Sequence, residues 1–455
     1  MSPERPLVAW YGDDMTGSID VLEGLAQAGL RAVLNVAPPD RAQLERYPWA
    51  QAVGWAGSTR TLAPAEVRNA VSAAAEVMLA SGARLIHYKI CSTFDSSSLV
   101  GSIGAAIDAA QDVVCSPFVA VMPAAPRLGR WCAFSNLFAR SGGDSAVFRL
   151  DRHPTMRAHP VTPMAESDVR RVLAAQSARP IGDLDLVTLN AGRPAVEARI
   201  DALADLGIDT FVCDTTSDGH LRLLASVLCA RAAEAPLLVV GSSGLEHGLA
   251  DALGQQPLGA PERQVEDVVL AVCGSRSPVT DRQIARAARD GWVEVALDLT
   301  SATRPEAGAR AVEVAAQEAR AALEAGTSVV VHTAGRALGD GDEAIRLPQL
   351  SGSERRRLGT TLGAVARHVL ARTPVRRLAI AGGDSSGDVL RELGAEALEI
   401  AGAFAPAMPF CRLHGPAAPD GVEVICKGGQ TGSPSFFEEV RLGRPTIHEP
   451  IEVQA

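Results

Sequence analysis

Two adjacent carboxylates, Asp13 and Asp14, are the first residues of the chain whose types and spacing could do chemistry. They follow an apolar segment, residues 7–11, that has the length and composition of a strand. Apolar residues then recur at the spacing of one helical face, so the two acids are expected between a strand and a helix. Ligands of open α/β sheets bind at the carboxyl ends of strands. One carboxylate could deprotonate a substrate hydroxyl while the other caps the helix, or both could be ordinary capping residues.

Cations follow at two further places. Lys89 ends the strand-like segment 84–90 and precedes a hydroxyl-rich loop, residues 91–98, that contains Ser92. A cation beside several hydroxyl donors suits a polyhydroxylated acid, whereas an apolar ligand would leave these donors unpaired. A serine-rich helix cap beside a solvated lysine is the alternative. Arg60, in a Gly-Ser-Thr-Arg segment, is a weaker candidate for the same site.

Three glycine-rich segments follow predicted strands in the second half of the chain, at residues 273–280, 382–387 and 427–432. Glycines let the backbone approach a ligand closely, and the free N–H groups of a following helix attract anions. We expect Pro278 in the first turn of one such helix and another helix to start near Asp388. The third segment begins with one of the only two lysines of the chain. Three such segments in one domain favour a site for nucleotide phosphates.

The elements that must position these residues alternate between short β-branched runs and longer amphipathic stretches, which predicts an α/β fold. We expect two domains, each a mainly parallel sheet flanked by helices. The polar segment 255–266 is interrupted by two prolines and is the predicted linker between domains at residues 1–254 and 267–455. The predicted strands cover residues 7–11, 31–36, 84–90, 118–122, 185–189, 210–213 and 237–240, then 268–272, 293–297, 328–331, 377–381 and 422–426.

Composition argues against several classes of protein. The chain has 455 residues, 47% of them hydrophobic, and a formal net charge of −10, so a disordered chain and a general nucleic-acid surface are disfavoured. The cysteines are dispersed and the histidines form no metal-binding motif, so we expect reduced thiols and leave any metal ligands unknown. The chain shows no targeting segment and no apolar run of transmembrane length, which predicts a cytoplasmic protein without a membrane partner. The P-loop motif is also absent from the sequence, and no dinucleotide-binding motif opens the first predicted helix.

Together and in this order, these segments resemble the four-carbon acid sugar kinase family, whose members phosphorylate threonate, erythronate and 3-oxo-tetronate. The marks that carry the resemblance are Asp13-Asp14-Met15-Thr16-Gly17, Met122-Pro123-Ala124-Ala125-Pro126 with Gly129-Arg130, His159-Pro160-Val161-Thr162, Gly241-Ser242-Ser243-Gly244-Leu245 and the three glycine-rich segments. The loop after Lys89 departs from the family pattern, because Cys91 stands in place of an aspartate and an arginine-glycine pair is missing. A divergent branch acting on a related branched or oxo acid, such as 3-oxo-isoapionate, would fit this departure.

The resemblance implies that the N-terminal domain holds the sugar acid and the C-terminal domain holds ATP, with phosphoryl transfer in the cleft between them. Arg60 and Lys89 would bind the acid together with Ser92, and Asp14 or Asp13 would deprotonate its hydroxyl, which we expect to be the terminal one. The residues expected to contact ATP, with Mg²⁺ bridging its phosphates, are Ser275, Ser277, Gly382, Gly383, Asp384, Ser385, Lys427 and Gly429.

Two alternatives stay open at this point. A sugar-acid lyase or aldolase would use Lys89 as a desolvated amine and the aspartate pair as proton shuttles. A non-enzymatic sensor would close on a sugar acid without chemistry. Dependence on ATP separates the kinase from both alternatives. A homodimer is a further expectation for a metabolic enzyme of this size.

Overall fold

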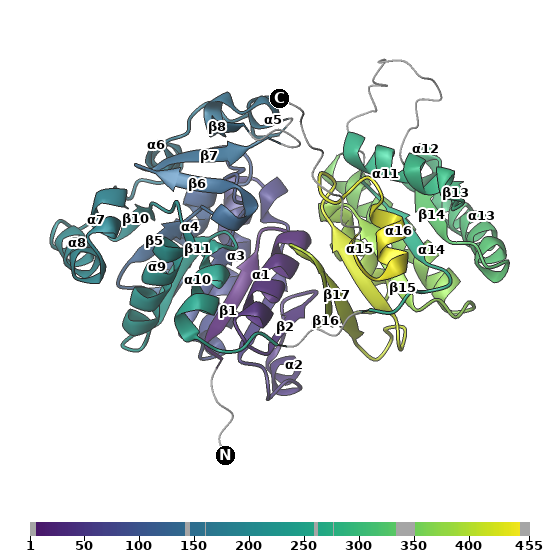
Figure 1. Cartoon of the computed structure of the whole chain (residues 1–455), viewed down its shortest axis with the longest axis horizontal. Coiled ribbons are helices and arrows are strands. Elements are labelled where there is room, and N and C mark those ends of the chain that lie inside the picture. The colour runs from purple at the N-terminus through teal and green to yellow at the C-terminus, as the bar shows by residue number, and fades with distance from the viewer. Residues whose placement is uncertain are drawn as a thin grey trace, which may run out of the picture. The chain divides into compact units, whose positions relative to one another are not determined.

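The structure is a computed structural model that describes residues 6–141, 146–159, 161–258, 263–275, 277–333 and 351–445. The chain divides into two compact units, Met1–Leu258 and Gly259–Ala455. Each unit is an α/β body and is described by itself (Figure 1). The two-domain α/β fold expected from the sequence is therefore confirmed, while the bounds of the predicted linker at residues 255–266 stay a prediction.

The first unit is built on one parallel sheet with the strand order β2-β3-β1-β4-β11-β5-β10-β9. Most of its strands are buried along their whole length, as expected for a parallel sheet covered on both faces. The strands are β1 (Val8–Gly12), β2 (Ala32–Asn35), β3 (Ala52–Ala56), β4 (Leu85–Lys89), β5 (Val119–Met122), β9 (Ile181–Leu184), β10 (Thr210–Cys213) and β11 (Leu237–Gly241).

Helices cover both faces of this sheet. The connections through α1 and α9 cross the sheet in one direction, and those through α3 and α4 cross it in the other. Because such connections are right-handed, α1 and α9 lie on one face and α3 and α4 on the other. Helix α10 packs against α1 and α9. The helices are α1 (Met15–Gln27), α2 (Arg41–Glu45), α3 (Pro64–Ala80), α4 (Ile103–Val114), α5 (Pro154–Arg157), α6 (Val169–Ala174), α7 (Leu186–Asn190), α8 (Arg193–Asp205), α9 (Asp218–Ala232) and α10 (Gly244–Leu253), with 3₁₀ turns η1 (Thr59–Thr61), η2 (Pro126–Leu128) and η3 (Leu150–Arg152).

A small antiparallel sheet, which the sequence did not lead us to expect, lies between β5 and α6 in the chain. It consists of β6 (Arg130–Ala133), β7 (Asn136–Arg140) and β8 (Val147–Arg149). The β6–β7 turn contains two residues with positive φ, Phe134 and Ser135. The buried carboxylate of Asp214 accepts hydrogen bonds from both of their N–H groups, at 2.6 and 2.8 Å, and so stabilises this turn.

The second unit has the strand order β13-β14-β12-β15-β18-β17-β16, in which the first five strands pair in parallel and β17 pairs antiparallel with both of its neighbours, β18 and β16. Helices α13, α14 and α15 pack in series, and α11 packs with α16. The strands are β12 (Leu270–Cys273), β13 (Val293–Ala296), β14 (Val329–His332), β15 (Arg377–Ala381), β16 (Ala397–Ala405), β17 (Met408–His414) and β18 (Glu423–Lys427). The helices are α11 (Pro278–Arg289), α12 (Leu299–Ala302), α13 (Pro305–Glu324), α14 (Gly352–Leu370), α15 (Gly383–Glu392) and α16 (Phe436–Leu442).

Two predicted elements differ from the structure. The predicted strand at residues 185–189 is wrong, because the Asp185 carboxylate accepts a 2.8 Å hydrogen bond from the Thr188 N–H and starts helix α7 there. The helix expected near Asp388 begins earlier, at Gly383, so that part of the second glycine-rich segment is helical. Pro278 does lie in the first turn of α11, as predicted. Within the described residues, no helix has both the length and the apolar character needed to cross a membrane.

Candidate active site

Parallel pairing in register brings the predicted acid-binding residues of the first unit to one edge of its sheet. Gly12 at the end of β1 is the register partner of Lys89 at the end of β4, and Lys89 is also the partner of Gly241 at the end of β11. The Asp13 N–H donates a 3.0 Å hydrogen bond to the Lys89 carbonyl. The aspartate pair and the first lysine are therefore neighbours, although 76 positions of sequence separate them (89 − 13).

Asp14 caps α1. Its backbone is extended, and its Oδ1 accepts a 2.6 Å hydrogen bond from the Gly17 N–H while Oδ2 accepts one from the Thr16 hydroxyl at 3.1 Å. Its carbonyl also accepts a 2.7 Å bond from the Ser18 hydroxyl. This is the usual role of an aspartate at a helix start. Both of its carboxylate oxygens are thus used within the protein.

Arg60 in η1 joins the two aspartates. Its Nη2 lies 2.9 Å from Asp13 Oδ1 and its Nε lies 3.2 Å from Asp13 Oδ2, while Nη1 lies 3.0 Å from Asp14 Oδ2. The Arg60 side chain keeps 25% of its surface exposed, against 6% and 7% for the aspartates. A two-point guanidinium–carboxylate contact fixes both the position and the orientation of Asp13.

The two aspartates differ in their pKa values. Burial raises the pKa of Asp13 and the negative charge of Asp14 raises it further, although Arg60 opposes both effects. Burial acts in the same direction on Asp14, but there Arg60, the Gly17 N–H and Lys89 prevail and lower the pKa. A general base works best when its pKa approaches the operating pH. The raised pKa therefore favours Asp13 over Asp14 as the candidate proton acceptor.

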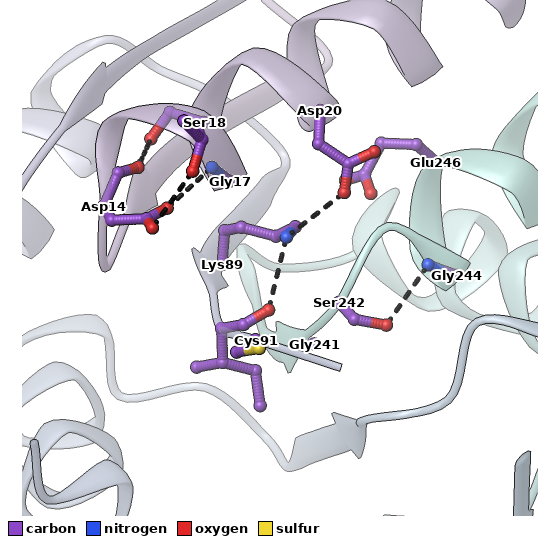
Figure 2. A network of polar contacts seen from close by, with 12 residues as sticks. Asp14, Gly17, Ser18, Asp20, Lys89, Cys91, Gly241, Ser242, Gly244 and Glu246 are labelled. Carbon is purple, nitrogen blue, oxygen red and sulfur yellow. Dashed lines mark hydrogen bonds and ion pairs between the residues drawn. The ribbon is translucent and has the colours of Figure 1, made fainter. Parts of the chain in front are cut away.

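Lys89 is almost fully buried behind this pair. Its ammonium lies 3.4 Å from the Asp20 carboxylate of α1 (Figure 2) and donates a 3.3 Å hydrogen bond to the Ile90 carbonyl. Burial acts to lower the pKa of Lys89, but the carboxylates of Asp20, Asp13 and Glu246 outweigh it and raise the pKa. Lys89 is thus held as a cation, which suits binding of an acid. A Schiff-base mechanism needs a neutral amine, so this environment opposes the aldolase alternative.

Sequence reasoning missed three ionisable residues around Lys89. Asp20 pairs with it directly, and Glu246 of α10 lies fully buried with its Oε1 2.9 Å from Nδ1 of the equally buried His87. An isolated acid inside the apolar stretch of α10 was a usable signal, because an ionised carboxylate is costly to bury. Asp20 gave no such signal, since its role depends on how α1 lies against β4.

Gly17 keeps space open among the acids and the lysine. A Cβ atom at this position would lie 2.7 Å from Asp14 Oδ1, 3.4 Å from Lys89 Nζ and 3.6 Å from Asp13 Oδ1. Any larger residue would therefore intrude among the groups expected to meet the substrate. The glycine of the Asp-Asp-x-Thr-Gly motif has a steric role that the sequence alone did not reveal.

The loop after β4 carries polar groups next to this cluster. The Cys91 thiol lies 2.9 Å from the Thr93 hydroxyl, which donates a 2.9 Å hydrogen bond to Asp95 Oδ1. Burial and the charge of Asp95 raise the pKa of Cys91 to about 11, so the thiol stays protonated at neutral pH. Ser92 lies half-buried in the same loop. The loop offers hydrogen-bonding groups of the kind that bind substrate hydroxyls.

In the second unit, the three glycine-rich segments follow three neighbouring strands, β12, β15 and β18. The Gly274 and Ser275 N–H groups both donate to the Ala381 carbonyl at 3.0 Å, and the Gly382 N–H donates to the Lys427 carbonyl at 2.9 Å. The segments predicted to bind phosphates therefore meet at one edge of the sheet.

Glycines allow these three segments to pack together closely. A Cβ atom on Gly429 would lie 2.5 Å from Ser275 Oγ, and one on Gly382 would lie 2.4 Å from Ser385 Oγ. Ser277 caps α11 and its hydroxyl also bonds the Gly429 carbonyl. These serines and glycines form one connected backbone-rich cradle, which is the type of surface that binds phosphate groups.

Helix α15 adds a helix N-terminus to the cradle. It starts at Gly383 after Gly382, whose φ of 140° only glycine adopts readily, and no side chain caps it. An uncapped helix start presents N–H groups and a partial positive charge to an anion. The backbone of Asp384 lies in this first turn, while its side chain is outside the described part of the structure. Its predicted contact with ATP stays a prediction.

Lys427 connects two of the three glycine-rich segments of the cradle. Its ammonium donates to the Thr280 hydroxyl at 3.1 Å, the Gly428 carbonyl at 2.9 Å and the Thr431 carbonyl at 3.2 Å, and its side chain is fully buried. Burial lowers its pKa to about 8. All three donors are engaged, so in this structure Lys427 positions the loop. Its expected direct contact with phosphate stays untested.

Metal ligands are the remaining part of the expected site. The described residues contain no group of three or more histidines, cysteines, aspartates or glutamates that could hold a metal ion. Mg²⁺ in nucleotide sites is often held by one or two carboxylates together with the phosphates and water. The first unit offers carboxylates of this type in Asp13 and Asp14, and the cradle offers hydroxyl and backbone groups.

Comparison with known proteins matches each of the two units to a different domain model. Residues 8–249 match the model of a sugar-binding N-terminal domain, and residues 270–437 match that of a nucleotide-binding C-terminal domain. A 3-oxo-isoapionate kinase of Paraburkholderia graminis is 37% identical over 97% of this chain and 95% of its own length. A 3-oxo-tetronate kinase of Cupriavidus necator is 31% identical over 96% of each chain.

Solved structures agree with these sequence matches. A crystal structure from Salmonella typhimurium has a TM-score of 0.75 at 26% identity and covers 95% of this chain and 97% of that one. A Haemophilus influenzae protein, 24% identical, shares the fold with a TM-score of 0.69 over 95% of this chain and 99% of its own. The domain models and the near full-length relatives show that the chain belongs to the four-carbon acid sugar kinase family.

Proposed function

We propose that this protein transfers the γ-phosphoryl group of Mg-ATP to a hydroxyl, the terminal one, of a small sugar acid. The observation that carries the proposal is the Asp13–Arg60–Asp14 cluster beside the buried cation Lys89, all at the carboxyl edge of one parallel sheet. The first unit would hold the acid, and the glycine cradle of the second unit would hold the triphosphate.

In the proposed reaction, Asp13 accepts the proton of the substrate hydroxyl as its oxygen forms a bond to the γ-phosphorus. The bond between the γ-phosphorus and the oxygen that bridges it to the β-phosphate breaks, and ADP leaves with that oxygen. Phosphoryl transfer asks a protein mainly for alignment and charge stabilisation. Arg60 keeps Asp13 aligned, and the N–H groups at the start of α15 and around Gly429 hold phosphate oxygens. When bound, Mg²⁺ would neutralise charge that develops on the phosphates, and the carboxylate and hydroxyl groups named above would hold it.

Two relatives bear on the substrate. The 3-oxo-isoapionate kinase is more similar to this chain than the 3-oxo-tetronate kinase of Cupriavidus necator, at 37% against 31% identity. The Cys91-Ser92-Thr93 loop, which departs from the usual family pattern, lies beside the proposed base. We therefore place branched oxo acids first among the candidate substrates and unbranched 3-oxo-tetronates second.

The test is ADP release with Mg-ATP across a panel of tetronic, 3-oxo-tetronic and branched oxo acids, with an acid-free control. Phosphorus NMR of the product would identify the phosphorylated hydroxyl. Release with one or two acids supports the kinase. Cleavage of an acid without ATP would instead support the lyase. A protein that binds the acid but neither turns it over nor binds ATP would support the sensor. The cytoplasmic location and the homodimer stay predictions.

A further inference from the structure

Arg130 is the first residue of β6 and lies at the same edge of the sheet as the aspartate pair. Its backbone exchanges hydrogen bonds with Ala125, N–H to carbonyl at 3.2 Å in one direction and 3.1 Å in the other. Ala125 belongs to the segment that follows β5, two strands from β4 in the sheet. Arg130 is thus anchored to the loops that leave the carboxyl ends of the strands.

Among the described residues, the charge of Arg130 lacks a carboxylate partner, in contrast to the charges of Arg60 and Lys89. Arg60 is neutralised by Asp13 and Asp14, and Lys89 by Asp20. The Nη1 group of Arg130 donates only to the Leu128 and Gly129 carbonyls, at 2.8 and 3.1 Å. Among the described residues, no carboxylate oxygen lies within 4 Å of its guanidinium.

One donor of Arg130 is also left unused. Its Nε is buried and has no hydrogen-bond partner within the described structure. Burial lowers the pKa of Arg130, although the carboxylate of Asp95 opposes this effect. A buried donor without a partner and a cation without a counter-charge are both costly. A bound carboxylate would satisfy both, because a guanidinium can bind it through two parallel hydrogen bonds.

Arg130 also lies near the residues expected to contact substrate. The carboxylate of Asp95 affects the pKa of both Arg60 and Arg130, so the loop after β4 lies within electrostatic range of both guanidinium groups. The Thr93 hydroxyl and the Asp95 carboxylate of this loop could bind hydroxyls between them.

We propose that Arg130 binds the carboxylate of the sugar acid, which places the reacting hydroxyl, at the other end of the molecule, next to Asp13. The orientation rests on the proposed kinase function, whereas the recognition of a carboxylate by Arg130 does not require turnover. It predicts that the protein prefers an acid to the neutral polyol of the same length, and that this preference depends on Arg130.

The experiment is calorimetric titration of the full chain, without ATP, with 3-oxo-isoapionate, 3-oxo-tetronate, D-threonate and the neutral polyol threitol. The variants are Arg130→Gln and Arg130→Lys, with Arg140→Gln as the matched control. Arg140 lies exposed on the neighbouring strand β7, with its guanidinium 5.8 Å from the Trp131 ring centre. Thermal melting establishes that each variant is folded, and Arg130→Lys keeps the test available if Arg130→Gln does not fold.

We expect Arg130→Gln to weaken binding of the preferred acid about tenfold to a hundredfold, which corresponds to about 1.4–2.8 kcal/mol. Arg130→Lys should lose less, and Arg140→Gln should match the wild type. Threitol binding should be the same in all four proteins, so that the preference for acid disappears in Arg130→Gln. Equal losses for acid and threitol, or unchanged acid binding, would overturn the proposal. So would failure of all the acids to bind the wild-type protein.

Kinetics separates this proposal from the proposed function. If an acid binds in an Arg130-dependent way but never stimulates ADP release, the assignment of Arg130 stands and the kinase reaction fails. If ADP is released, Arg130→Gln should raise the KM for the acid and leave the KM for ATP unchanged.

Discussion

Arg60 and Asp13 are joined by two hydrogen bonds, from Nη2 to Oδ1 at 2.9 Å and from Nε to Oδ2 at 3.2 Å. The third nitrogen of the same guanidinium reaches Asp14. One cation thereby acts on two neighbouring carboxylates whose pKa values move in opposite directions.

This arrangement predicts unequal roles for the two aspartates. Asp13→Asn should lower kcat by about 10²–10⁴-fold, because the amide cannot take the hydroxyl proton. Asp14→Asn should lower it less, since an amide oxygen can still accept the Gly17 N–H that caps α1. The KM for ATP should change little in either variant. Steady-state kinetics of both variants measures the order, and a larger loss in Asp14→Asn would transfer the role of base to Asp14.

The pH dependence of kcat/KM should report the ion pair. Asp13 must be ionised to act as a base, so activity should fall as the pH drops through its pKa. Arg60 lowers that pKa. Arg60→Gln should therefore move the acidic limb of the profile to higher pH, by about one unit or more. Arg68→Gln, which removes an arginine paired with Asp108 on the surface, is the control and should leave the limb in place. An acidic limb that does not move in Arg60→Gln would argue against this coupling.

Gly17→Ala should impair the acid site through steric crowding. The new methyl group would lie 2.7 Å from Asp14 Oδ1, and crowding of this kind costs about 1–3 kcal/mol. We expect a raised KM for the sugar acid and a lower melting temperature. Gly219→Ala is the control, because in α9 the added methyl group would have only the Ser217 hydroxyl nearby, at 3.6 Å. If Gly17→Ala bound the acid as well as Gly219→Ala does, the space beside Gly17 would not belong to the site.

Gly429→Ala in the glycine cradle should weaken the binding of ATP and not that of the acid. The methyl group would lie 2.5 Å from Ser275 Oγ and push apart two of the three segments. The KM for ATP should rise about tenfold while the KM for the acid stays unchanged. Gly308→Ala in α13 meets nothing closer than 3.5 Å and should behave like the wild type. A change confined to the acid would contradict the assignment of the second unit to ATP.

Lys427 should make the free energy of unfolding depend on alkaline pH. Its pKa falls from 10.5 to about 8 on folding, so the unfolded chain binds more protons between pH 8 and 10.5 and stability rises with pH there. The slope is at most about 1.4 kcal/mol per pH unit for one group. Lys427→Met should lack this contribution. Urea unfolding of both proteins at several alkaline pH values measures the difference. The tyrosines and thiols are common to both proteins, so their contributions cancel in this difference. Parallel pH dependences would contradict it.

Much of the fold could be predicted because local pattern decides it. Buried β-branched runs identified β1, β4, β12 and β15, and the glycines after them marked the edge where ligands bind. The antiparallel pairs β6–β7 and β16–β17 escaped prediction, because most of their strands are partly exposed and lack a continuous buried run, and because the β6–β7 turn depends on a distant residue. The Phe134–Ser135 turn, for example, relies on Asp214, which is about 80 residues away.

For the candidate site, the sequence indicated which residues lie together but not the contacts that each of them makes. Asp13, Asp14, Arg60 and Lys89 do lie together, as do the three glycine-rich segments. Whether the pKa of Asp13 or Asp14 is raised or lowered depends on where Arg60 lies in three dimensions, and the spacing of residues in the sequence does not show that position. The same holds for Lys427, whose burial depends on Thr280 and Phe436 from two other elements.

The burial of both lysines also determines how the protein can be modified. Lys89 is 3% exposed and Lys427 is 0% exposed, and the chain has no other lysine. Amine-directed reagents and lysine acetyltransferases therefore find no accessible side chain on the folded molecule. Labelling of either lysine by such a reagent would report an opening of the domain that contains it, which makes the pair a built-in probe of local unfolding.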